Sequence, residues 1–241
     1  MDAPYIPLLE CEHLSKRYTK NGYFALYDLN LTLVRGRVVG LLGPNGSGKS
    51  TLIKLITGLL VPTEGSVRVN GVTVTADSTE TRERIAYLPE RIALDKSRSV
   101  AQYLTFFRDF YPNFNAGRAL DMLSRLCIDP GMKLKTMSKG TLEKVQLILT
   151  MARDADLYLL DEPIAGVDPA ARDYILGTIF SCASPFSTIL LSTHLIYDIE
   201  PILTDAIFLR QGQIMIAGDA NAIRNDKGKS LDMLFREVFR C

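Results

Sequence analysis

Hydrophobic and polar residues alternate over short stretches in the first part of the chain, a pattern that predicts β-strands. The alternating runs are LLECEHL (8–14), YFALYDLNLTLV (23–34) and SVRVNGVTV (66–74). The last run contains Asn70-Gly71, a pair typical of a tight turn between two strands. RGRVVGLL (35–42) is apolar without alternation, as in a strand buried on both faces, and IAYLP (85–89) predicts another short strand.

The pattern becomes helical between about Glu90 and Thr150. VAQYLTFFRDFY (100–111) and AGRALDMLSRLC (116–127) carry apolar residues at helical spacing, and the turn-forming segments PNFN and DPGMK follow them. A further helix is expected after the glycine-rich stretch near position 45, running through about Leu60. The middle of the chain is therefore predicted to be a mainly helical block.

Strands return in the last part of the chain. LYLLDEP (157–163) and TILLSTH (188–194) are predicted buried strands, 205–218 a hairpin around Gln211-Gly212, and 228–241 a short closing helix. We predict an α/β fold, with an N-terminal antiparallel β subdomain and an inserted α-helical subdomain. We expect a single domain that spans residues 1–241. Its core comprises about 1–89 and 151–241, and its helical subdomain about 90–150.

Composition and charge narrow the class of protein. The chain has 241 residues, 47% of them hydrophobic, and a formal net charge of +1. That balance argues against nucleic acid as the main partner, because nucleic-acid binders usually carry a basic face. The four cysteines have no metal-ligand or redox spacing, so we expect reduced thiols. Neither a signal peptide nor a run of about 20 apolar residues is recognised, so any membrane span is expected in another chain.

A glycine-rich loop, GPNGSGKST, follows one predicted buried strand and precedes a predicted helix. Its Gly43, Gly48, Lys49 and Ser50 fit the phosphate-loop pattern G-x-x-x-x-G-K-[S/T]. Glycines let backbone N–H groups turn toward an anion, and the helix start adds its own free N–H groups and its dipole. Lys49 is expected to reach the β- and γ-phosphates, and the Ser50 hydroxyl to bind Mg²⁺. We expect nucleotide contacts at Asn45, Gly46, Ser47, Gly48, Lys49, Ser50 and Thr51.

Two adjacent carboxylates and a histidine end the two later buried strands. Asp161 is suited to hold Mg²⁺, and Glu162 to polarise an attacking water. His194 follows TILLST at the sheet edge where the carboxylates emerge, so it is placed to sense the γ-phosphate and orient that water. These parts suit phosphoryl transfer from ATP to water, rather than binding of a dinucleotide.

Together these motifs make the chain resemble the nucleotide-binding subunit of an ABC transporter, built on a P-loop NTPase (RecA-like) core. GPNGSGKST resembles the Walker A motif, LYLLDEP the Walker B motif with its catalytic glutamate, and STH the switch-histidine motif. GVDP resembles the D-loop, with Asp168 as its aspartate, and Tyr18 stands where the family places an aromatic that stacks on adenine. MSKGT occupies the place of the LSGGQ signature, so Ser138 and Gly140 are expected to contact the γ-phosphate of a second subunit.

Two positions depart from the family pattern. Lys139 replaces a signature glycine, and its side chain either faces the phosphate or points to water. If the loop requires a positive φ there, Lys139 is strained. Glu90, in YLPER, replaces the glutamine that contacts Mg²⁺, and it is a potential third metal-binding residue beside Ser50 and Asp161. The same exchange is found in exporter ATPases similar to those of lantibiotic immunity, which favours export.

The resemblance implies an ATPase with ATP and Mg²⁺ as cofactors, located in the cytoplasm on the inner face of the cell membrane. Two copies, identical or different, would close head-to-tail over two ATP molecules and drive a separate transmembrane permease, which would dock near 90–111. Two alternatives stay open: a soluble ABC-type ATPase acting on ribosomes or DNA, and a nucleotide-gated binding module with little turnover. The transported substance cannot be predicted from this chain.

Overall fold

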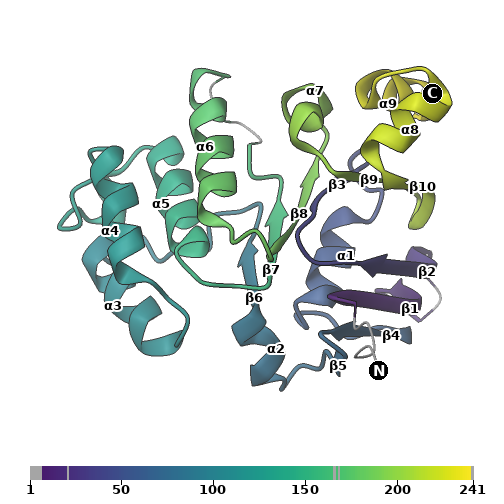
Figure 1. Ribbon diagram of the computed structural model, residues 1–241. Helices are drawn as coiled ribbons and strands as arrows, with labels where there is room; N and C mark the ends of the chain where they lie inside the picture. The colour runs from purple at the N-terminus through teal and green to yellow at the C-terminus, as the bar shows by residue number, and fades with distance from the viewer. Residues whose placement is uncertain (1–6, 21, 165–166, 168, 240–241) are drawn as a thin grey trace, which may run out of the picture.

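The computed structural model describes residues 7–20, 22–164, 167 and 169–239. A four-stranded antiparallel sheet, in the order β2-β1-β4-β5, forms one layer (Figure 1). Its strands are β1 (Leu9–Arg17), β2 (Phe24–Leu33), β4 (Glu64–Val69) and β5 (Val72–Thr73). Asn70 and Gly71 join the last two strands with φ values of 53° and 77°, so the predicted tight turn is confirmed.

A second, six-stranded sheet has the order β10-β9-β3-β8-β7-β6. Its strands are β3 (Val38–Leu42), β6 (Ile85–Leu88), β7 (Leu157–Asp161), β8 (Thr188–Thr193), β9 (Asp205–Arg210) and β10 (Gln213–Asp219). All neighbours are parallel except β9 and β10, which form the predicted antiparallel hairpin. Leu42 pairs with Thr193 and Asp161 with Ser192, so β3, β7 and β8 end at the same edge of the sheet.

Helices cover both faces of this sheet (Figure 1). They are α1 (Lys49–Ile56), α2 (Thr79–Arg84), α3 (Val100–Phe110), α4 (Ala116–Arg125), α5 (Lys139–Met151), α6 (Pro169–Cys182), α7 (Ile196–Ile199), α8 (Ala220–Lys227) and α9 (Leu231–Val238), with 3-10 turns η1 (Leu134–Thr136) and η2 (Glu200–Ile202). α1 lies between the two sheets, whereas α3, α4 and α5 stand together at the far side of β6, drawn in teal. None of the helices in the described ranges is long and apolar enough to cross a membrane.

Two hydrophobic clusters hold these layers together. The first joins the antiparallel sheet and α1 to one face of the mixed sheet, and Leu159 of β7 belongs to it. The second lies on the opposite face, beneath α3 to α6, and includes Tyr158 and Leu160 of the same strand. Because successive side chains of β7 enter different clusters, the strand is apolar up to Leu160, as its sequence predicts.

The helix predictions need correction at α1 and near the C-terminus, and α2, α6 and α7 were not predicted. α1 ends at Ile56, four residues before the predicted Leu60, because Gly58 takes a left-handed φ of 72°. The N–H groups of Gly58 and Leu60 then bond to carbonyls of Leu55 and Lys54, which closes the helix. Near the C-terminus a second helix, α8, precedes the predicted closing helix α9, and Gly228 separates the two.

Candidate nucleotide site

The phosphate loop connects β3 to α1, and its glycines are required by its geometry. Gly46 and Gly48 have φ values of 80° and 111°, which other residues rarely adopt. A Cβ on Gly48 would lie 2.7 Å from the Ala25 carbonyl oxygen. α1 begins at Lys49 without a side-chain cap, so the N–H groups of its first turn are available for an anion.

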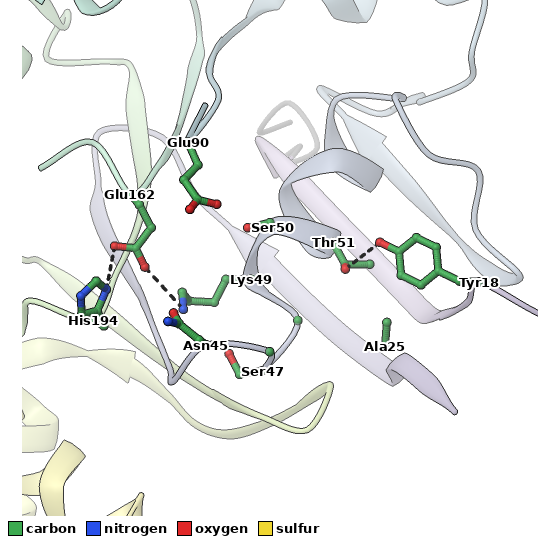
Figure 2. Close-up of a pocket in the computed structure, with 12 residues that line it drawn as sticks. Tyr18, Ala25, Asn45, Ser47, Lys49, Ser50, Thr51, Glu90, Glu162 and His194 are labelled. Carbon is green, nitrogen blue, oxygen red and sulfur yellow. Dashed lines mark hydrogen bonds and ion pairs between the residues drawn. The ribbon is translucent and has the colours of Figure 1, made fainter. Parts of the chain in front are cut away.

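A cavity of about 460 Å³ opens in front of this loop (Figure 2). Its size suits a small-molecule ligand. It is lined by Tyr18, Ala25, Asn45, Gly46, Ser47, Gly48, Lys49, Ser50, Thr51, Glu90, Glu162 and His194. Most of the predicted site residues therefore meet in one place, although they come from segments between 18 and 194 in the chain. Ala25 was not predicted, and nothing in its local sequence marks it.

Glu162 lies between two positively polarised groups in the wall of the cavity (Figure 2). One carboxylate oxygen, Oε1, is 3.6 Å from the Lys49 Nζ, and the other is 3.0 Å from the His194 Nδ1. Lys49 also donates to the Gly43 and Pro44 carbonyls at 2.7 and 3.3 Å. The lysine, the carboxylate and the histidine thus form one connected group beside the phosphate loop.

Asp161 is buried directly behind Ser50. Its Oδ1 accepts hydrogen bonds from the Ser50 hydroxyl at 3.1 Å and from the Ser192 hydroxyl at 2.7 Å. Glu90 faces the same region from the loop after β6 (Figure 2). Burial raises the pKa of Tyr87 to about 12, and the carboxylates of Asp161 and Glu90 add to that rise. The hydroxyl and carboxylate oxygens gathered here are the donors that Mg²⁺ prefers.

Tyr18 stands at the end of the cavity opposite Glu162 and His194 (Figure 2). The residue is 61% exposed, and its hydroxyl lies 3.0 Å from the Thr51 Oγ1. An exposed aromatic face beside the first turn of α1 is available for a nucleobase whose phosphates lie on the loop.

The predicted signature residues do not line this cavity. Ser138 caps α5, where its Oγ accepts a hydrogen bond from the Thr141 N–H at 3.2 Å, and Gly140 is exposed. Lys139 has helical backbone geometry, so the strain considered from sequence is absent there. Its Nζ lies 3.7 Å from the Glu143 Oε1 in the same helix. Asp168 lies outside the described residues.

Two buried side chains that sequence reasoning missed support the site. Ser192 contacts Asp161 and also accepts a hydrogen bond from the Glu162 N–H at 3.0 Å. The Gln146 amide accepts from the Ala93 N–H at 2.8 Å and donates to the Pro89 carbonyl at 3.1 Å, which fixes both sides of the Glu90 loop. Ser192 lies within the quoted STH motif, whereas Gln146 stands between the apolar residues Val145 and Leu147 of α5 and gives no signal by itself.

Fold and site together define a P-loop nucleotide-binding ATPase with a helical insertion. Residues 26–165 match the model of the family described as ABC transporter. "ABC-type transporter ATP-binding protein EcsA" of Bacillus subtilis is 29% identical over 239 residues, covering 96% of each chain. The chain belongs to the ABC transporter family, as an ATP-binding subunit with ATPase activity.

Solved structures agree with this assignment. The "Structure of ATP binding subunit of ABC transporter" has a TM-score of 0.87 at 33% identity, covering 97% of this chain and 100% of that one. The "Dimeric Structure of MJ0796, a Bacterial ABC Transporter Cassette" has a TM-score of 0.77 at 22% identity, covering 88% and 98%. At that lower identity the second likeness concerns the fold alone.

Proposed function

We propose that this chain is the ATP-hydrolysing motor of an ABC exporter, working with a second cassette and a separate transmembrane permease. Glu162 is the base that polarises the attacking water, His194 orients the water and the γ-phosphate, and Lys49 contacts the β- and γ-phosphates. The observation that carries these roles is the position of the Glu162 carboxylate, in the cavity wall between Lys49 and His194. The Tyr18 ring would stack on adenine at the other end of the cavity.

A Mg²⁺ ion fits the oxygen donors beside the phosphate loop. Ser50 would hold it directly, Asp161 through water, and Glu90 from the loop after β6. When bound, Mg²⁺ neutralises charge that develops on the phosphates. Support comes from the 3.1 Å contact between the Ser50 and Asp161 oxygens, and from the position of Glu90 in the wall of the same cavity.

A second cassette would complete the site. Ser138 and Gly140 lie at the exposed N-terminus of α5, where N–H groups and a hydroxyl are suited to a phosphate, yet they do not line the cavity of their own chain. Head-to-tail pairing would place them on the nucleotide of the partner. The dimeric cassette among the structures of the same fold is consistent with such pairing.

The permease would dock on the helical segment at 90–111. On α3, Phe106 and Phe110 are exposed by 42% and 65%, and their rings stack with centroids 5.5 Å apart. An exposed aromatic pair of this kind is suited to an interface with another protein. This docking would place the chain in the cytoplasm, on the inner face of the membrane. Glu90, in place of the glutamine usual in the family, favours export over import.

The mass of the Glu162→Gln variant in solution, measured by light scattering with and without ATP and Mg²⁺, tests this function. The amide cannot act as a base, so ATP should bind without being hydrolysed, and the mass should double. Lys49→Ala in the same background is the control, and it should stay monomeric because it lacks the phosphate contact. A Glu162→Gln chain that still releases phosphate at the wild-type rate would contradict the role given to Glu162.

A variant that binds ATP but stays monomeric would contradict pairing of identical chains. The same measurement with the permease present would then be required, because closure would depend on a different partner.

A further inference from the structure

The Ser192 side chain connects two acidic residues of the site, Asp161 and Glu162. Ser192 is the fifth residue of β8, it is completely buried, and it pairs with Asp161 across the parallel ladder. Its hydroxyl donates to the Asp161 Oδ1 at 2.7 Å and accepts from the Glu162 N–H at 3.0 Å. A hydroxyl has one hydrogen to donate and lone pairs to accept, so both bonds can exist together.

The second of these bonds supports an unusual backbone. Glu162 has a φ of 52°, a left-handed conformation that is uncommon for a residue with a side chain. Its N–H also lies 3.1 Å from the Ser192 carbonyl oxygen, so both acceptors on this N–H belong to one residue. This turn, directly after β7, directs the Glu162 side chain into the cavity (Figure 2), whereas the Asp161 carboxylate accepts a hydrogen bond from Ser50.

We propose that Ser192 is a positioning residue for ATP hydrolysis. Through one hydroxyl, it fixes the Asp161 carboxylate toward Ser50 and the backbone turn that presents Glu162. Loss of the hydroxyl frees the Asp161 carboxylate to rotate and removes one acceptor from the Glu162 N–H. This inference rests on the metal and base roles proposed above for Asp161 and Glu162.

The matched control is Ser187, just before the opposite end of β8. It is also buried, and its hydroxyl donates to the Ala155 carbonyl at 2.7 Å, outside the nucleotide cavity. Ser187→Ala therefore removes a comparable buried hydroxyl without touching Asp161 or Glu162. A second comparison, Ser192→Thr against Ser192→Val, holds the side-chain size constant and removes only the hydroxyl.

The first readout is ADP affinity by calorimetry, in Mg²⁺ and in EDTA, which does not depend on turnover. Ser192→Ala should bind ADP in EDTA like the wild type, but should lose much of the gain that Mg²⁺ gives. The second readout is steady-state hydrolysis of ATP. There Ser192→Ala should lower kcat about 10- to 100-fold, the range for removing a group that orients a metal ligand, with a smaller change in KM.

Ser187→Ala should lower the midpoint of thermal unfolding but leave the Mg²⁺-dependent gain in ADP affinity and the kcat for ATP unchanged. Ser192→Thr should keep more of that gain and a higher kcat than Ser192→Val. The proposal is overturned if Ser192→Ala matches Ser187→Ala, or if the Thr and Val variants behave alike.

The Asp161→Asn variant distinguishes a failure of the metal role proposed for Asp161 from a failure of the positioning role proposed for Ser192. If Mg²⁺ does not raise the ADP affinity of the wild type, or if Asp161→Asn keeps the full gain, the proposed metal role of Asp161 fails, and the inference about Ser192 fails with it. If Asp161→Asn loses the gain and Ser192→Ala keeps it, only the inference about Ser192 fails.

Discussion

The ammonium group of Lys49 lies 3.6 Å from one oxygen of the Glu162 carboxylate, and the two side chains are only 5% and 8% exposed. Each charge is thus compensated by the other in a region with little water. Removing one member of such a pair leaves the other buried without its partner, which is usually more costly than removing both.

Lys49→Ala should therefore destabilise the fold by about 3 kcal/mol, and addition of Glu162→Gln should recover a substantial part of that loss. Urea unfolding of the wild type, both single variants and the double variant gives the coupling energy directly. If the stability loss of the double variant equals the sum of the losses of the two single variants, the two charges do not interact. The lysine variant should also bind ATP far more weakly, because among the described residues no other lysine or arginine lines the cavity.

His194 should affect turnover much more than nucleotide binding. Its Nδ1 contacts the Glu162 Oε2 at 3.0 Å, so His194→Ala removes a group that holds the base. We expect kcat to fall by about two orders of magnitude, with ADP affinity nearly unchanged. Phosphate release and ADP titration measure these two quantities separately.

The control for this prediction is His13→Ala. His13 is the other histidine of the chain; it bonds to Asp28 on the antiparallel sheet and is largely exposed. That variant should hydrolyse ATP like the wild type. If instead His194→Ala keeps the wild-type rate, the role of His194 is wrong.

Most of the site could be predicted because its parts lie in short local motifs. Asp161 ends the buried strand β7, His194 directly follows β8, and the phosphate loop with Lys49 follows β3. Strands that are parallel neighbours in one sheet end at the same edge. The double contact of Ser192 could not be predicted, since it depends on the register between β7 and β8, which the sequence alone does not set. The end of α1 was misplaced because the apolar spacing continues past Gly58, where the backbone becomes left-handed.

Tyr18 should contribute to affinity for every adenine nucleotide and not to the chemical step. Tyr18→Ala should weaken ADP and ATP binding by about 1–3 kcal/mol, the range for stacking of one base on an aromatic ring. Tyr18→Phe keeps the ring and should therefore keep the affinity for both nucleotides. Titration with ADP checks both. Tyr23→Ala is the control, because that side chain is fully exposed and does not line the cavity. Equal affinities for the Ala and Phe variants at Tyr18 would exclude stacking.

Cys11 should make the protein less stable in alkali. Burial raises the pKa of its thiol from 9.0 to about 12, so the folded protein keeps a proton that the unfolded chain loses above pH 9. The folded state is then disfavoured progressively as pH rises from 9 toward 12, by roughly 1 kcal/mol per pH unit. Urea unfolding at pH 8 and pH 10 should show a smaller decline for Cys11→Ala than for the wild type. Equal declines would mean that Cys11 does not stay protonated in the fold.

Substitution of Arg153 should lower the free energy of unfolding more than substitution of any other arginine. Its guanidinium lies 3.9 Å from the centre of the Tyr111 ring and donates to the Ile85, Arg82 and Glu83 carbonyls. Burial lowers its pKa, so these contacts offset the cost of a buried charge. Arg153→Lys keeps the charge but cannot reproduce the planar set of donors, and it should cost about 3 kcal/mol in the free energy of unfolding.

The matched control is Arg125→Lys on α4, where the arginine pairs with Asp121 at 2.8 Å and both side chains are mostly exposed. That change should stay within about 0.5 kcal/mol. Urea unfolding of the two variants gives the comparison. Arg153 joins the end of α2 and the start of β6 to Tyr111, just after α3, so its loss should also loosen the helical segment relative to the sheet. Hydrogen exchange should then rise in α3 and not in β3, and a uniform rise over both elements would argue against a local link.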